Sequence, residues 1–368
     1  MSRISIALAG TLAGLFLCGQ VSAADLKIGI MVPTTGSEAT AGKDMENSIK
    51  LAVDEINKAG GVLGMNIVTI TGDDGCDPQM ATAAASKLVS SDVVGVVGGY
   101  CSGATLPTLK IYGDAGTPFV VAAANSTKLI DANPGTSFQI NSTGFDQVNT
   151  AVSLFAEKGI RKLAIVHQGD GYSEDLAKLT KDKWTAMGNE VVAYEVVNKG
   201  EQDQSSLVTK LKSTAPDAVF WTAYYSDGAL LIKQLRQAGF RKLIAVGDGS
   251  NSPKLLEIAG KAAEGVLCFS NPTAEYLPAA KNYTASYKAA YKQAPDAYGP
   301  LAYDGMKLMA DAITRAGSTD KAAIVKALKE TKDFNGITGA VSFTDKNTLA
   351  KSNFVVLVAK GGKWTLLK

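Results

Sequence analysis

The chain has 368 residues, which is more than one hydrophobic core usually serves, so its length favours two domains. Its 37 basic and 35 acidic residues leave a net charge of +2, and nucleic acid is therefore not an expected partner. The single histidine, His167, excludes a multi-histidine metal site. None of the four cysteines forms a Cys-x-x-Cys pair, which excludes zinc ribbons and thioredoxin-type redox motifs.

The N-terminus has the pattern of a secretory signal peptide. Arg3 supplies a positive charge, residues 4–18 are largely apolar, and the small residues 21–24 offer a cleavage site. A membrane anchor is one alternative, although the apolar run is short of the roughly 20 residues that a bilayer span needs. A lipidated Cys18 is another, but Leu17 stands where a small residue is wanted. We expect residues 1–24 to be removed and a soluble mature protein in the periplasm.

From residue 26 onwards, short β-branched runs alternate with longer amphipathic stretches. The first series consists of a strand (26–32), a helix (41–58), a strand (65–71), a helix that opens at 77–78, and further segments at 93–97, 106–112 and 119–121. After a connecting stretch near 137–143 the pattern restarts. The second series has strands at 163–166, 191–197, 218–221, 243–246 and 266–269, with helices at 172–187, 204–212 and 229–238. Two helical segments (274–291 and 301–316) and two hairpin-like strands (339–343 and 354–359) complete the chain.

This alternation predicts the fold class. Strands separated by helices favour parallel sheets covered on both faces, and two such series predict two α/β lobes. The connection at 137–143 lacks a flexible Gly/Ser or Pro-rich linker, which indicates a hinge. Ligands bind beyond the carboxyl ends of the strands in open α/β sheets. Two lobes that present those ends to each other would form a clamshell around a ligand.

Export changes how the remaining cysteines are interpreted. In an oxidising compartment, Cys76 and Cys101 can form a disulfide, and two reduced, buried thiols are the alternative. Cys268 lies in a strand-like apolar run and is expected to be a buried free thiol. Nothing around it indicates a catalytic nucleophile.

Several segments together resemble one family. They are residues 54–64 (DEINKAGGVLG), 73–78 (DDGCDP), 99–102 (GYCS), 164–167 (AIVH) with Tyr172, and 303–305 (YDG). In this order they are similar to the periplasmic leucine/isoleucine/valine-binding proteins of ABC transporters, over essentially the whole mature chain. The resemblance implies the type I periplasmic binding fold: two Rossmann-like lobes, three hinge crossings and a ligand trapped between the lobes. It also implies a Cys76–Cys101 disulfide. We expect residues 25–143 with 272–350 to form lobe 1, and 144–271 with 351–368 to form lobe 2.

Four positions in the first part of lobe 1 are predicted to bind the ligand. Ser102 follows a strand where a helix begins, and free backbone N–H groups there suit a carboxylate. A plain N-cap serine is the alternative. Small residues Ala123 and Ala124 let a ligand approach the backbone, and the resemblance implies that the Ala123 carbonyl accepts from a ligand ammonium. It also implies that residue 125 donates to the carboxylate, although Asn125 replaces the usual threonine and is otherwise a turn residue.

The second lobe supplies Asp248, Tyr172 and Tyr224, and the later part of the first lobe supplies Tyr298. Asp248 follows a strand and matches the family's ammonium-binding glutamate, although it could instead cap the short helix at 252–258. Tyr172 and Tyr224 lie at strand exits and are expected as cleft walls, and Tyr298 matches an aromatic ring near the side-chain pocket. Ala41 stands where many leucine binders carry an aromatic residue, which indicates a wider or differently shaped pocket.

Motifs for catalysis are missing from the sequence. There is no Gly-x-Ser-x-Gly elbow, no Walker loop and no Gly-x-Gly-x-x-Gly turn that opens a helix. We therefore expect no enzyme, no cofactor and no metal, and a structural role for His167. The resemblance instead implies a monomeric substrate-binding component that captures a branched-chain or other neutral amino acid and delivers it to an inner-membrane permease. Two alternatives stay open: the same fold binding an aromatic acid, keto acid or amide, and a periplasmic ligand sensor.

Overall fold

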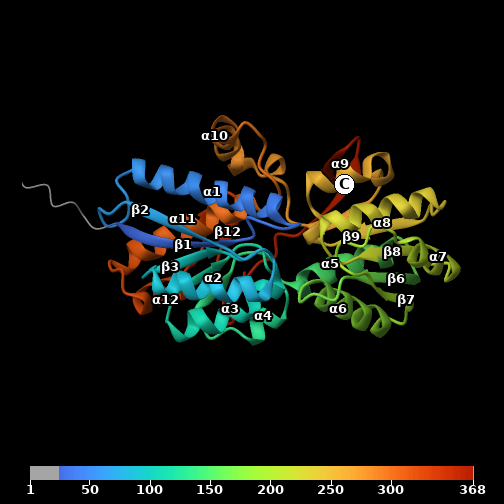
Figure 1. Cartoon of the computed structure of the whole chain (residues 1–368), viewed down its shortest axis with the longest axis horizontal. Helices are drawn as coiled ribbons and strands as arrows, with labels where there is room; N and C mark the ends of the chain where they lie inside the picture. The colour runs from blue at the N-terminus through green and yellow to red at the C-terminus, as the bar shows by residue number, and fades with distance from the viewer. Residues whose placement is uncertain (1–24, 368) are drawn as a thin grey trace, which may run out of the picture.

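The computed structural model describes residues 25–367, and the predicted signal peptide, with Cys18, lies outside this range. Two α/β lobes lie side by side along the long axis of the molecule (Figure 1). The first lobe contains a five-stranded parallel sheet in the order β2-β1-β3-β4-β5. Its strands are β1 (Leu26–Val32), β2 (Ile67–Asp73), β3 (Gly95–Gly98), β4 (Phe119–Val121) and β5 (Ser137–Gln139).

The helices of this lobe come from two distant parts of the sequence (Figure 1). They are α1 (Ala39–Lys58), α2 (Pro78–Ser90), α3 (Ser102–Asp114), α4 (Lys128–Asp131), α10 (Lys281–Tyr291), α11 (Gly299–Ala316) and α12 (Lys321–Lys329). Helix α10 lies outside α1 (Figure 1). The start of α2 confirms its sequence signal, because the Asp77 carboxylate accepts from two backbone N–H groups of the first turn and Pro78 opens the helix. A small sheet of β11 (Phe334–Gly336) and β12 (Gly339–Val341) completes the lobe.

The second lobe contains a seven-stranded sheet in the order β14-β13-β10-β9-β8-β6-β7. Its parallel strands are β6 (Lys162–His167), β7 (Glu190–Val196), β8 (Ala218–Trp221), β9 (Leu243–Val246) and β10 (Leu267–Ser270). The last two, β13 (Val355–Lys360) and β14 (Lys363–Leu366), join antiparallel at one edge. Its helices are α5 (Gly144–Glu157), α6 (Ser173–Ala186), α7 (Ser205–Ser213), α8 (Tyr225–Gln237) and α9 (Pro253–Ala259), with short 3-10 turns between them.

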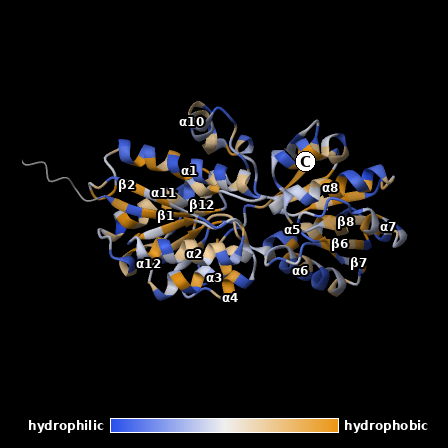
Figure 2. Ribbon diagram, viewed as in Figure 1, coloured by the Kyte–Doolittle hydropathy of each residue, from blue (hydrophilic) through white to orange (hydrophobic). Residues whose placement is uncertain are grey.

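Each lobe buries its sheet between helical layers. Strands such as β3 and β8 are buried along their whole length, as expected for parallel strands covered on both faces. Figure 2 shows hydrophobic residues concentrated along the strands and on the inner faces of the helices. Cys268 is buried in β10 as a free thiol, which confirms that prediction. Within residues 25–367, no helix has both the length and the apolar character needed to cross a bilayer.

The chain passes between the lobes three times, and hydrogen bonds join the three crossings to one another. Asn271 Nδ2, after β10, donates to Asn141 Oδ1, after β5, over 2.8 Å. Ser142 Oγ donates to Asn353 Oδ1, before β13, over 2.7 Å. The three segments therefore form one narrow hinge. The lobe boundaries that we propose, after residues 143, 271 and 350, fall at these crossings.

Two expectations about local structure were wrong. The strands at 339–343 and 354–359 do not pair as a hairpin: β12 pairs with β11 in the first lobe, and β13 pairs with β10 and β14 in the second. Strand pairing of this kind depends on long-range contacts, so adjacency in sequence misled the prediction. The stretch at 137–143 is likewise not only a connection, because its first three residues form β5.

Candidate functional site

A small cavity lies between the lobes at the carboxyl ends of their strands. It is lined by Tyr100, Ser102, Ala123, Asn125, Tyr172, Tyr224, Asp248, Gly249 and Tyr298. The structure thus brings together all the predicted ligand-binding residues except Ala124, which is buried behind the lining with its carbonyl accepting from Gln139 Nε2. Strands β3 and β4 of one lobe and β6, β8 and β9 of the other lead into this cavity, in agreement with the rule for open α/β sheets.

Ser102 is the first residue of α3, and its hydroxyl is oriented by the neighbouring loop. Ser102 Oγ accepts hydrogen bonds from the backbone N–H groups of Asn125 and Ser126, each over 3.2 Å. A serine hydroxyl has two acceptor positions and one proton, so these bonds leave the proton to donate toward the cavity. The first N–H groups of a helix have no intrahelical acceptor and favour an anion. Ser102 and α3 together can therefore hold a carboxylate.

Asp248 lies on the opposite side of the cavity, directly after β9, and is buried with 2% of its surface exposed. Its Oδ1 accepts from the Tyr172 hydroxyl over 2.7 Å, and its Oδ2 accepts from Asn125 Nδ2 over 3.0 Å. Asn141 Nδ2 lies 3.4 Å from the same Oδ2. These donors are all neutral, so they orient the carboxylate but do not neutralise its charge.

Burial raises the pKa of the Asp248 carboxyl, and the hydrogen bonds from Tyr172, Tyr298 and Asn141 oppose this effect. A buried carboxylate without a cationic partner is costly unless a ligand supplies the positive charge. An ammonium group placed in the cavity would do so. The electrostatics of Asp248 therefore favour a cationic group on this side of the site.

The Ala123 carbonyl and Asn125 complete the polar part of the cavity. Ala123 O accepts from Asn141 Nδ2 over 2.6 Å and keeps a second lone pair for a ligand. The side chain of Asn125 is directed at Asp248, so it bridges the two lobes in this structure. Its role as a donor to a ligand carboxylate stays a prediction.

Four tyrosine rings form the rest of the wall. Tyr100 packs edge-on against Tyr298, with 5.2 Å between ring centroids, and lies 5.9 Å from Tyr224. Tyr224 in turn lies 5.4 Å from Tyr172. These rings leave a cavity of about 10 Å³, and Ala41 is not among the residues that line it. The expectation that Ala41 gives a wider or differently shaped pocket than in leucine binders stays a prediction.

Sequence reasoning missed Tyr100, Asn141 and Glu38. Tyr100 and Asn141 each follow a strand of the first sheet, so the strand-exit rule that identified Ser102 applied to them as well. Glu38 precedes α1 and is fully buried, with Oε2 3.4 Å from the Tyr100 hydroxyl and Oε1 without a hydrogen-bond partner. Burial raises the pKa of Glu38 to about 7. No local pattern indicated that this carboxyl would lie behind the aromatic wall.

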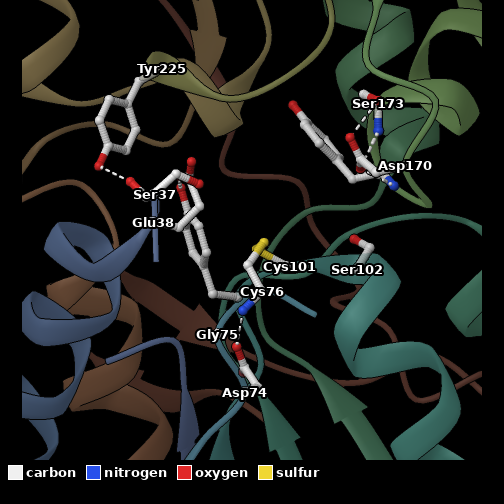
Figure 3. Close-up of a disulfide and its surroundings, with 12 residues drawn as sticks. Ser37, Glu38, Asp74, Gly75, Cys76, Cys101, Ser102, Asp170, Ser173 and Tyr225 are labelled. Atoms are coloured by element: carbon white, nitrogen blue, oxygen red, sulfur yellow. Dashed lines mark hydrogen bonds between the residues drawn. A yellow bond between two sulfur atoms is a disulfide. The ribbon is translucent and has the colours of Figure 1, made fainter. Parts of the chain in front are cut away.

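The predicted disulfide is present and anchors the start of α3. Cys76 and Cys101 are bonded, with 5.4 Å between their Cα atoms, and Cys101 immediately precedes Ser102 (Figure 3). Asp74 Oδ1 accepts from the Cys76 backbone N–H over 2.8 Å, which fixes the other end of the bridge. The disulfide thus ties the loop after β2 to the loop that presents Ser102.

We expect the Cys76→Ser, Cys101→Ser double variant to lose about 3–4 kcal/mol of unfolding free energy, because the bridge closes a loop of 25 residues. Urea unfolding of the oxidised protein and of the double variant measures this difference. The Cys268→Ser variant serves as the control, since it removes a buried thiol without altering the loop. A loss below about 1 kcal/mol would show that the bridge does not constrain the unfolded chain.

Contacts across the cleft show that the lobes are closed on each other. The Tyr225 hydroxyl donates to the Ser37 carbonyl over 2.8 Å (Figure 3). Thr127 N donates to Asp175 Oδ2 over 2.7 Å, next to the hinge. Gly103 of α3 and Gly171 of the second lobe meet backbone to backbone, so that a Cβ on Gly171 would lie 2.9 Å from Gly103 Cα. The cavity is thus enclosed by both lobes.

A pair of buried carboxyls supports the segment that carries Tyr298. The Asp296 backbone N–H donates to Asp44 Oδ1 over 2.9 Å, and Asp296 Oδ2 accepts from Ser252 Oγ of the second lobe over 2.9 Å. Burial raises the pKa of Asp44 to about 6 and that of Asp296, which also faces Asp44, to about 7. Both carboxyls are therefore easier to bury when protonated.

This pair predicts how stability depends on pH. In the unfolded chain both carboxyls titrate near pH 4, so between about pH 4 and 7 the folded protein binds more protons than the unfolded chain. The contribution of the two carboxyls to folding stability is therefore present at low pH and is lost as pH rises toward 7. The wild-type contribution should raise the melting temperature at pH 5 relative to that at pH 8. We expect this difference to be smaller in Asp296→Asn. The exposed Asp203→Asn control should leave that difference unchanged, and equal differences in both variants would contradict the assignment.

The contacts of His167 agree with the structural role predicted for it. It is buried, its Nδ1 accepts from the Gly169 N–H over 3.1 Å, and its ring packs against Tyr194. Burial lowers its pKa, which favours the neutral form. Among residues 25–367 there is no cluster of three or more His, Cys, Asp or Glu side chains that could hold a metal ion.

Two closed α/β lobes with a polar cavity at their strand ends define a two-lobe ligand receptor, and comparison with known proteins identifies which kind. The chain belongs to the periplasmic binding protein family, whose model matches residues 25–363. It is 31% identical to a Leu/Ile/Val-binding protein homolog 2 of Brucella abortus, over 96% of this chain and 95% of the relative. It is 30% identical to the leucine-, isoleucine-, valine-, threonine- and alanine-binding protein of Pseudomonas aeruginosa, over 97% and 95%.

A solved structure shares both the fold and the sequence pattern. The branched-chain amino acid transporter substrate-binding protein of Streptococcus pneumoniae, in complex with isoleucine, is 28% identical and superposes with a TM-score of 0.86. The match covers 93% of this chain and 98% of that protein. The predicted fold, a type I periplasmic binding protein, is therefore confirmed, as is the resemblance on which that prediction depended.

Proposed function

We propose that this protein is the periplasmic substrate-binding component of an ABC transporter and that its ligand is a neutral α-amino acid. One observation carries the proposal: a buried carboxylate with neutral partners, Asp248, faces a helix N-terminus with an oriented hydroxyl, Ser102, across one small cavity. A zwitterion carries the opposite charges in the same arrangement. The relative in Pseudomonas aeruginosa is named for binding amino acids, and the one from Streptococcus pneumoniae was solved with isoleucine, which supports this choice.

Capture would proceed by closure of the lobes about the hinge. A ligand that touches both Asp248 and Ser102 has contacts in the closed form that it lacks in the open form, and this difference in affinity shifts the protein toward closure. The closed receptor would then deliver its ligand to permease subunits in the inner membrane, as a monomer and without a cofactor or chemical step. Its proposed location, the periplasm, agrees with the predicted signal peptide and with the Cys76–Cys101 disulfide.

The test is calorimetric titration of the protein after denaturation, removal of any bound small molecule and refolding. Alanine, valine, leucine and isoleucine are titrated alongside benzoate and pyruvate, which have a carboxylate but no ammonium. Binding of at least one amino acid with 1:1 stoichiometry, tighter than either amine-free acid, would support the proposal. Tighter binding of an amine-free acid would show that the ligand belongs to the alternative class and that Asp248 does not bind an ammonium group.

The same polypeptide could act as a sensor, and the membrane protein that it binds distinguishes this role from transport. Co-purification of permease subunits with the amino-acid-loaded protein from a native membrane extract separates the two roles. Recovery of a transmembrane receptor in their place would favour the sensor.

A further inference from the structure

The aromatic end of the cavity is closely packed. Tyr100, Tyr172, Tyr224 and Tyr298 are each at most 5% exposed and are in contact as a chain of rings from both lobes. The cavity that they leave is about 10 Å³, which is space for roughly one water molecule. In this closed position the rings therefore leave little free space between the lobes.

The rings cannot easily turn away to make room. The Tyr172 hydroxyl donates to Asp248 and accepts from the Gly249 N–H over 3.1 Å. Tyr224 and Tyr172 pack so closely on Gly249 that a Cβ there would lie 3.2 Å and 2.8 Å from their ring atoms. The Tyr298 ring meets the edge of Tyr100. A close-packed wall of this kind resists added volume, because a displaced side chain leaves its preferred rotamer.

Tyr100 is held in this wall by its backbone position and by a contact of its hydroxyl. Its backbone lies between Gly99 and the disulfide-bonded Cys101. Its hydroxyl lies 3.4 Å from Oε2 of the fully buried Glu38, so the polar tip is directed away from the cavity. The cavity consequently meets the apolar ring of Tyr100. This ring therefore presents an apolar surface to the cavity, next to the rings of Tyr224 and Tyr298.

We infer that this receptor selects amino acids with the shortest side chains, such as glycine, alanine and serine, and that Tyr100 sets the limit. The inference rests on the proposed function, because it takes the ammonium and carboxylate contacts as given. Larger ligands would hold the lobes apart and lose closing contacts such as Tyr225 to Ser37 and Gly103 to Gly171. One methylene too many in a fitted pocket typically changes recognition by about 10- to 200-fold.

The experiment compares affinities for glycine, alanine, serine, valine and leucine by calorimetric titration. In the wild-type protein we expect alanine to bind at least tenfold more tightly than leucine. In Tyr100→Leu, which removes the ring and keeps an apolar side chain, we expect this ratio to fall at least tenfold through tighter leucine binding. Tyr276→Leu, a tyrosine outside the cavity, is the matched control and should keep the wild-type ratio.

The outcomes distinguish failure of the size limit from failure of the proposed function. Leucine or isoleucine binding as tightly as alanine to the wild-type protein would overturn the size limit and leave the proposed function intact. Binding of none of the amino acids would contradict the proposed function itself. If Tyr100→Leu does not fold, as judged by circular dichroism, Tyr298→Leu tests the same wall. An unchanged ratio in a folded variant would remove Tyr100 as the determinant.

Discussion

Replacement of Asp248 by asparagine is expected to weaken amino acid binding by roughly 30-fold to several thousand-fold. The loss of one partner from a buried, hydrogen-bonded charge pair costs about 2–5 kcal/mol, and each 1.4 kcal/mol is a factor of ten in affinity. The asparagine side chain keeps the shape of the aspartate and has no negative charge for an ammonium group. Calorimetric titration of alanine into the stripped variant measures the change.

Two controls distinguish a ligand contact from a structural role. Pyruvate lacks the ammonium, so its weak affinity should not fall in Asp248→Asn. Asp304→Asn removes another buried carboxyl, which accepts from the Ile337 and Thr338 N–H groups of the first lobe and does not line the cavity. That variant should lose stability and keep its affinity. An affinity within threefold of wild type in Asp248→Asn would show that Asp248 does not bind the ammonium.

Asp248 also illustrates how far the sequence predicts this site. Ser102, Asn125, Tyr172, Tyr224 and Asp248 all follow strands, and one rule about parallel sheets places such residues at a common edge. Each strand and helix can be predicted from nearby residues alone, because its periodicity and turn residues are local features of the sequence. The predicted order of strands and helices is what allows the rule to be applied. The resemblance to a known family then supplied a chemical role for each position.

What the sequence could not predict depends on contacts between distant segments. The amide of Asn125 bonds to Asp248 of the other lobe, and this direction is decided by lobe closure. The Glu38 carboxyl meets the Tyr100 hydroxyl across a separation of 62 residues in the sequence. The pairing of β12 with β11 and of β13 with β10 is likewise set by the tertiary structure, where short strands adopt whichever partner completes a buried sheet.

Closure of the lobes leads to the second large effect that we expect. Gly171→Ala should weaken amino acid binding at least about tenfold, because its Cβ would lie 2.9 Å from Gly103 Cα across the cleft. The clash is with the backbone of a helix, which cannot move aside as a flexible side chain can. If the ligand binds only the closed form, affinity falls by the same factor as the population of that form. Neither glycine has a positive φ, so alanine is tolerated by the local backbone.

The Gly171 prediction is tested by small-angle X-ray scattering together with titration. The ligand-saturated wild-type protein should become more compact than the unliganded protein, whereas ligand-saturated Gly171→Ala should stay less compact than saturated wild type. Gly103→Ala is a graded control, because its Cβ would lie 3.3 Å from Gly171 N and needs only a small adjustment. Its loss of affinity should be the smaller one. If Gly171→Ala reaches full compaction and still binds more weakly, the glycine contact does not set the closed position. The weaker binding would then indicate that the substitution displaces Tyr172, the ligand-facing residue that directly follows Gly171.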